Sequence, residues 1–256
     1  MSFERGRCSL AVAGVGAVLV LAGGCSSATG DVSTEPKTPA SSKAPSASVQ
    51  PLSGAELVAA LPTEGALPGY IVTGTPKSSA DGGTSDSDVR PKACRSLWGA
   101  RARASTGSVA SAWIPIARSG FAPPTEFLTF ASYDSGGAKA HLASLDTALN
   151  TCSSLSFLDS YGTRHTADVE RVENQTALGD TSVSFRMHWT YDQDGFKSDT
   201  FVLVTTVRQG EATVTDVANA SVGSQLSASK KRAFMPKVDP DMLNSQVAAL
   251  REAQGH

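Results

Sequence analysis

The chain has 256 residues, of which 40% are hydrophobic and 6% aromatic, and its formal net charge is −2 at neutral pH. The mildly acidic balance, without a basic cluster, argues against nucleic acid as a partner, because phosphate backbones are held by grouped lysine and arginine. The low aromatic content gives no indication of a sugar-binding platform.

The N-terminus has the order of a secretory signal. A short basic segment with Arg5 and Arg7 precedes an uncharged apolar core, Leu10 to Ala22. This core is shorter than the roughly 20 apolar residues of a membrane-spanning helix and has the length of a signal-peptide core. We therefore predict that residues 1–24 form a signal peptide. A plain transmembrane anchor and a signal cut after an A-x-A-like site are the alternatives.

The apolar core ends in Leu21-Ala22-Gly23-Gly24-Cys25, which resembles the lipobox of bacterial lipoproteins. The resemblance implies cleavage between Gly24 and Cys25 and attachment of lipid to the Cys25 sulfur. A diacylglycerol supplies two acyl chains, which stable anchoring needs. The predicted location is the extracytoplasmic face of the cell membrane, with the membrane itself as a partner through the anchor.

Residues 25–51 are predicted to be a disordered tether. Val32 and Val49 are the only large aliphatic residues between Ser26 and Gln50, and there is no aromatic residue. Such a segment buries too little apolar surface to offset the entropy of ordering. A coil of this length reaches roughly 25–30 Å. A passive spacer is the favoured interpretation, and wall attachment or glycosylation is the alternative.

Residues 52–256 are predicted to form one folded domain. Its first helix has Ser53 as N-cap and Glu56 as the capping-box partner, and its last helix has Asp239 as N-cap before Pro240. The expected helices are Leu52–Leu61, Arg90–Ala104, Gly136–Cys152 and Pro240–Ala253.

Seven segments are predicted to be strands. From Val183 to Tyr191 apolar and polar residues alternate strictly, so that one face packs on a core and the other meets solvent or a ligand. Runs of strands with helices between them predict an α+β fold, in which a twisted antiparallel sheet has helices packed on one face. The expected strands are Gly69–Thr75, Val109–Ala117, Thr125–Tyr133, His165–Val172, Thr181–Tyr191, Thr200–Val207 and Ala212–Ala218.

Two cysteines remain once Cys8 leaves with the signal and Cys25 takes lipid. Cys94 and Cys152 form an even pair in an exported setting, and we predict a disulfide between them. Closing this loop contributes about 4 kcal/mol in the chain-entropy model. No Cys-x-x-Cys or His-x₃-His spacing accompanies the pair, so we expect no metal site.

Two groups of basic residues can be interpreted either as solvent-exposed surface or as binding sites. Arg95, Arg101 and Arg103 are expected on a solvated helix face, with a basic patch as the alternative. The run Lys230–Arg232 is expected in a solvated loop, with contact to anionic lipid or wall polymer as the alternative. His141 is interpreted as a hydrogen-bonded residue at the margin of its helix rather than as a ligand.

The sequence shows no arrangement typical of an enzyme. There is no G-x-S-x-G elbow, phosphate loop or dinucleotide fingerprint. The acidic residues Asp180, Asp192 and Asp194 fit turns better than a paired-carboxylate site. We therefore predict a non-catalytic protein without a cofactor, whose ligand-binding residues are unknown.

The folded part resembles the extracellular sensor domains of PknH-like mycobacterial Ser/Thr kinases and related actinobacterial lipoproteins. The motifs are LSGAELVAALP, ACRSLW, LNTC, ALGDTSVSFR and VRQGEATVTDV, spread over Leu52 to Leu250. This resemblance implies binding or sensing at the envelope. A second resemblance, to lipoproteins whose half-barrel sheet cradles acyl chains, leaves a lipid or glycolipid carrier as the alternative function.

Overall fold

The computed structural model describes residues 50–79, 88–103, 105–119, 125–173, 176–193 and 195–255. The predicted signal peptide, the lipidation site Cys25 and nearly all of the tether lie outside these residues. No helix in the described ranges is long and apolar enough to cross a membrane. The account below concerns the compact unit from Ser46 to His256.

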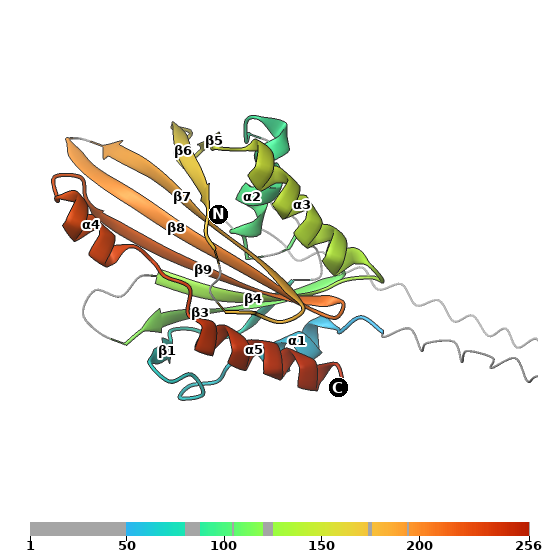
Figure 1. Cartoon of the computed structure of the whole chain (residues 1–256). Coiled ribbons are helices and arrows are strands. Elements are labelled where there is room, and N and C mark those ends of the chain that lie inside the picture. The colour runs from blue at the N-terminus through green and yellow to red at the C-terminus, as the bar shows by residue number, and fades with distance from the viewer. Residues whose placement is uncertain are drawn as a thin grey trace, which may run out of the picture. The chain divides into compact units, whose positions relative to one another are not determined.

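A nine-stranded antiparallel sheet forms the centre of this unit, in the order β1-β3-β4-β9-β8-β7-β6-β5, with β2 also paired to β3. The last five strands form a consecutive antiparallel meander, which contains the four strands predicted between His165 and Ala218 and adds β5, and β4 joins the meander through β9. Figure 1 shows the strands fanning out with the twist typical of such sheets. The strands are β1 Tyr70–Val72, β2 Lys77–Ser79, β3 Ala110–Arg118, β4 Thr125–Ser132, β5 Ser154–Leu158, β6 Arg164–Arg171, β7 Thr181–Gln193, β8 Phe196–Gln209 and β9 Ala212–Gly223.

Helices cover both faces of the sheet, and the fold is α+β as expected (Figure 1). On β9, Val214 belongs to a core with α1 and α5, whereas Val217 belongs to a second core with α2 and α3. These two valines point to opposite faces because strand side chains alternate. The expectation that helices pack on only one face of the sheet is therefore wrong. The helices are α1 Gly54–Ala60, η1 Lys92–Cys94, α2 Arg95–Ala100, α3 Gly137–Thr151, α4 Ala228–Phe234 and α5 Pro240–Ala253.

The two-sided arrangement follows from the central strands. In β8, Leu203 and Val204 are both fully buried although they point to opposite faces, and β4 likewise buries residues on both of its faces. A strand that is apolar on both faces needs a covering layer on each. The meander strand β7 alternates, as expected, and its even-numbered side chains are polar on the α5 side of the sheet.

Local signals set the helix ends as predicted. Ser53 Oγ accepts from the Glu56 backbone amide, and the Glu56 carboxylate accepts from the Ser53 amide. Asp239 caps α5 by accepting from the Met242 amide at 3.0 Å. The helix predicted over Arg90–Ala104 is longer than the observed one, since α2 spans only Arg95–Ala100 and Arg101 is its C-cap.

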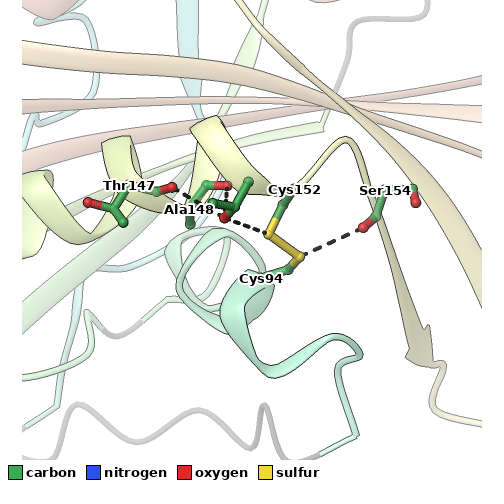
Figure 2. The surroundings of a disulfide bond; sticks show 6 residues. Cys94, Thr147, Ala148, Cys152 and Ser154 are labelled. Atoms are coloured by element: carbon green, nitrogen blue, oxygen red, sulfur yellow. Dashed lines mark hydrogen bonds between the residues drawn. A yellow bond between two sulfur atoms is a disulfide. The ribbon is translucent and has the colours of Figure 1, made fainter.

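The structure joins Cys94 and Cys152, with Cα atoms 5.8 Å apart (Figure 2). Cys94 closes the single turn of η1, and Cys152 follows the last residue of α3, where its amide donates to the Ala148 carbonyl. Cys94 Sγ also lies 3.7 Å from the Ser154 carbonyl oxygen at the start of β5. The disulfide thus holds α2, α3 and the sheet edge together.

Candidate functional site

Two histidines on the sheet each contact an aspartate. His165 Nε2 lies 2.9 Å from Asp159 Oδ2, and His188 Nε2 lies 3.2 Å from Asp199 Oδ1. Among the described residues, no serine, threonine or cysteine hydroxyl or thiol lies at hydrogen-bond distance from either imidazole. No group of three metal-ligating side chains occurs in the same ranges. The described part of the chain therefore presents no assembled catalytic triad or metal centre.

The third histidine, His141, lies on α3 and is largely buried. Its ring stacks on Tyr133 with centroids 5.6 Å apart, and its Nε2 lies 3.5 Å from Ser105 Oγ. Burial lowers the pKa of His141 to about 4. The ring is therefore neutral at physiological pH and packs as a core residue with a polar margin.

Arg101 lies on the indole ring of Trp98 at the end of α2. The guanidinium carbon is 3.5 Å from the ring centroid, and the ring itself is 8% exposed. Trp98 stacks in turn on Phe157 of β5, at 3.8 Å between centroids. Phe157 meets Trp189 of β7 edge-on at 5.3 Å. Arg101 therefore lies on the first of three aromatic rings that contact one another in sequence. Cation–π attraction orients the plane of its guanidinium group.

Arg103, two residues after Arg101, also lies on aromatic rings, which belong to strands β3 and β4. Its guanidinium carbon lies 4.3 Å from the Trp113 ring centroid and 5.7 Å from that of Phe127. Lys77 Nζ approaches the Trp113 ring from β2, at 5.2 Å. Trp113 and Phe127 are half-buried, whereas Arg103 is exposed.

Strand register places these rings on one face of the sheet. Trp113 pairs with Thr129, which has the same orientation as Phe127, and Phe127 pairs with Val217. Val217 belongs to the core that α2 and α3 cover, against which Phe127 and Trp189 also pack. We call this surface the arginine–aromatic face. Its members are Trp98, Arg101, Arg103, Trp113, Phe127 and Trp189.

The carboxylates of the described strands share one face of the sheet. Alternation and register turn every carboxylate on the described strands away from the arginine–aromatic face, toward the side of α4 and α5. Neither Arg101 nor Arg103 forms an ion pair with another described residue. The carboxylates concerned are Glu126, Asp168, Glu170, Asp192, Asp199 and Asp216.

No protein-family model matches the chain. No curated protein matches it either. Among solved structures, the chain is similar to the extracellular domain of PknH from Mycobacterium tuberculosis, with 12% identity over 81% of this chain and 100% of that one, and a TM-score of 0.48. It is also similar to LpqN, described as involved in cell envelope biogenesis of the same organism, with 13% identity over 77% of this chain and 87% of that one, and a TM-score of 0.27.

The sequence did not predict the arginine–aromatic face. The chain contains only three tryptophans, Trp98, Trp113 and Trp189, and the fold brings all three to this one surface. Arg101 and Arg103 were expected on a solvated helix face; Arg103 is exposed, but both follow the end of α2 and lie on aromatic rings. A sequence signal existed in the arginines of ARARA shortly after ACRSLW, because the ring under Arg101 is Trp98 of that motif, but the rings under Arg103 come from the later strands β3 and β4.

Proposed function

We propose that the chain is a membrane-anchored extracytoplasmic lipoprotein whose folded domain binds an envelope ligand without catalysing a reaction. The anchor rests on the signal-like N-terminus and on Cys25 in the lipobox-like LAGGC. The Cys94–Cys152 disulfide supports an exported domain, because disulfides persist in oxidising compartments. In the sequence, the predicted tether of residues 25–51 connects the proposed lipidation site to the folded domain.

The arginine–aromatic face is the observation that carries the binding part of this proposal. Exposed or half-buried aromatic rings next to arginine are enriched at recognition surfaces, where they combine apolar area with fixed hydrogen-bond donors. Here the two guanidiniums have rings for partners and lack a carboxylate within the described chain. A binding surface explains why cations are kept where the described residues supply no countercharge.

The anchor is tested by expressing the full chain in a bacterium that processes lipoproteins. We expect the protein in the membrane fraction, with a mass that corresponds to cleavage before Cys25 and addition of lipid. Cys25→Ser should abolish the lipid and leave an unprocessed chain. Cys8→Ser, in the segment that is removed, is the matched control and should be processed normally. Unlipidated wild-type protein would contradict the proposal.

Binding is tested by native mass spectrometry of the purified chain. If the domain binds an envelope ligand and is not a lipid carrier, we expect a single protein mass that shifts only when a ligand is added. Lipid that co-purifies in stoichiometric amount would instead favour the lipid or glycolipid carrier. Turnover of an envelope substrate that depends on His165 or His188 would contradict the non-catalytic proposal, because those side chains form the His–Asp pairs of the sheet.

A further inference from the structure

One arginine faces three carboxyl groups where the N-terminus of α5 meets the sheet. Arg118 of β3 donates from Nε to Glu126 Oε1 of β4 at 3.1 Å, and its Nη2 lies 3.7 Å from Oδ2 of Asp239, the N-cap of α5. The third carboxyl group belongs to Asp216 of β9. The register of β4 on β9 makes Glu126 and Asp216 diagonal neighbours on the α5 side of the sheet, roughly 7–8 Å apart between Cα atoms. We call these four residues the Arg118 cluster.

The Arg118 cluster is short of positive charge and of hydrogen-bond donors. Glu126 Oε2 and Asp216 Oδ1 are buried, and neither has a hydrogen-bond partner among the described residues. Burial, aided by the charge of Glu126, raises the pKa of Asp216 well above its usual range. A second buried carboxylate beside Glu126 would lack a cation of its own, which is unfavourable. The folded chain therefore favours the neutral, protonated form of Asp216.

The groups around the cluster do not replace Arg118 as its cation within the described chain. Tyr70 of β1 donates to Asp239 Oδ2 at 3.0 Å, and burial raises the pKa of Tyr70, so its hydroxyl keeps its proton. Lys237 contributes its carbonyl oxygen, which accepts from Arg118 Nη2 at 3.2 Å, while its side chain is exposed. The other charged or titratable groups on this side of the sheet are paired or exposed: Arg186 with Glu170, Lys231 and His188 with Asp199, and Asp241 on α5.

The segment Lys237–Pro240 is the least firmly packed part of this site. None of its four residues is buried, whereas Glu126 and Asp216 lie on β4 and β9, which are each paired on both sides. Three residues of the segment line a cavity of about 310 Å³ together with Leu178 and Arg186. If the charge of the cluster changes, the segment therefore moves more readily than the strands.

We propose that Asp216 is a pH-sensitive switch that controls whether the segment Lys237–Pro240 stays on the sheet. While Asp216 carries its proton, Arg118 is shared between Glu126 and Asp239 and ties the segment to β3. When the proton passes to solvent, the new carboxylate attracts Arg118 and repels Asp239, so the segment loses its ion pair and gains a neighbour of like charge. The switch lies on the opposite side of the sheet from the arginine–aromatic face and does not depend on it.

The sign of the response follows from the protonated closed state. The segment is held at acidic pH and is released as the pH rises through the pKa of Asp216 in the folded state. Two backbone amides report the release directly. The Met242 amide donates to the Asp239 side chain, and the Leu243 amide donates to the Asp239 carbonyl group.

The test measures amide hydrogen exchange in the full chain, purified in a detergent with an uncharged headgroup and corrected for intrinsic exchange rates. From about pH 5 to about pH 9 we expect the protection of the Met242 and Leu243 amides to fall at least tenfold, while the amides of β8 and β9 remain more protected than these two. Protection that is independent of pH would overturn the proposal. Equal protection of both sets at alkaline pH would overturn it too, because it would indicate unfolding of the whole domain.

Two variants separate the parts of the mechanism. Asp216→Asn removes the charge that would appear, and Asp239→Asn removes the charge that would be repelled while keeping a good N-cap. In each variant the protection of the Met242 and Leu243 amides should change less than twofold over the same pH range. Far-ultraviolet circular dichroism checks folding, and the half-buried position of Asp239 keeps the second variant usable if the first does not fold.

Asp241→Asn is the matched control. It makes the same substitution at an exposed carboxylate in the first turn of α5, outside the Arg118 cluster, and should keep the tenfold fall in protection. A fall of wild-type size in Asp216→Asn would overturn the proposal, because another group would then be titrating. Loss of the fall in Asp241→Asn would also overturn it, because the response would then follow the net charge of the helix end.

Discussion

Cys94 and Cys152 connect the start of α2 to the end of α3, on the face of the sheet that carries Arg101. The bond closes a loop with a sequence separation of 58 residues. Removing the bond with Cys94→Ala and Cys152→Ala should lower the free energy of unfolding by about 4 kcal/mol in the chain-entropy model. Denaturant titration measures this loss.

Reductant provides the control for this prediction. It should destabilise the wild type by a similar amount and leave the double variant unchanged. A wild type that is insensitive to reductant, together with thiols at both positions that react with a labelling reagent, would show that the bond does not form.

Those features that depend on neighbours in sequence were predictable. The capping box of Ser53 and Glu56 is complete within four residues, and the alternation in β7 is visible without a partner strand. The pairing of Cys94 with Cys152 was predictable for a different reason, because cysteine count and compartment left one combination.

Features that depend on the joining of distant strands were not predictable. The insertion of β4 beside β9, across more than 80 residues, determines that Phe127 shares a face with Trp189. The segment around Lys230 to Arg232 looked like a polar loop, yet it forms α4, since Ser227 caps it and Lys231 reaches Asp199. Short edge strands such as β2 and β5 have too few residues for a clear periodic pattern.

Arg101→Met tests whether Arg101 is kept for the fold or for a ligand. Methionine packs on Trp98 and removes a largely buried charge that has no counterion among the described residues. We expect the free energy of unfolding to rise by about 1 kcal/mol. Thermal melts measure this change in stability. Arg232→Met should change stability by less than about 0.5 kcal/mol. A lower melting temperature for Arg101→Met would assign Arg101 to the fold.

The carboxyl group of Asp216 should make the free energy of unfolding fall as the pH rises. Its carboxyl group is fully buried between strands, and burial, aided by the nearby Glu126, raises its pKa well above the usual 3.8. The folded state favours the protonated form of Asp216. The stability that the neutral carboxyl group contributes is therefore fully present below the pKa of Asp216 in the unfolded state. It is lost as the pH rises through the pKa of Asp216 in the folded state.

Asp216→Asn should remove that dependence. Asparagine is neutral at every pH, so the variant should exceed the wild type by about 2 kcal/mol at alkaline pH and differ little near pH 4. Denaturant titrations across this range measure the difference. Glu252→Gln, an exposed carboxylate on α5, is the matched control. Parallel profiles for wild type and Asp216→Asn would show that Asp216 is ionised in the folded state.

Lys231 should determine whether α4 stays on the sheet. None of the residues of α4 is buried, so the helix has little apolar contact with the sheet, and its Lys231 forms an ion pair with the buried Asp199 of β8. Lys231→Met should therefore raise amide hydrogen exchange within Ala228–Phe234 at least tenfold, because local opening no longer breaks a charge pair. Lys230→Met, at an exposed position of the same helix, should leave that exchange unchanged. Equal exchange in both variants would mean that other contacts hold α4 in place.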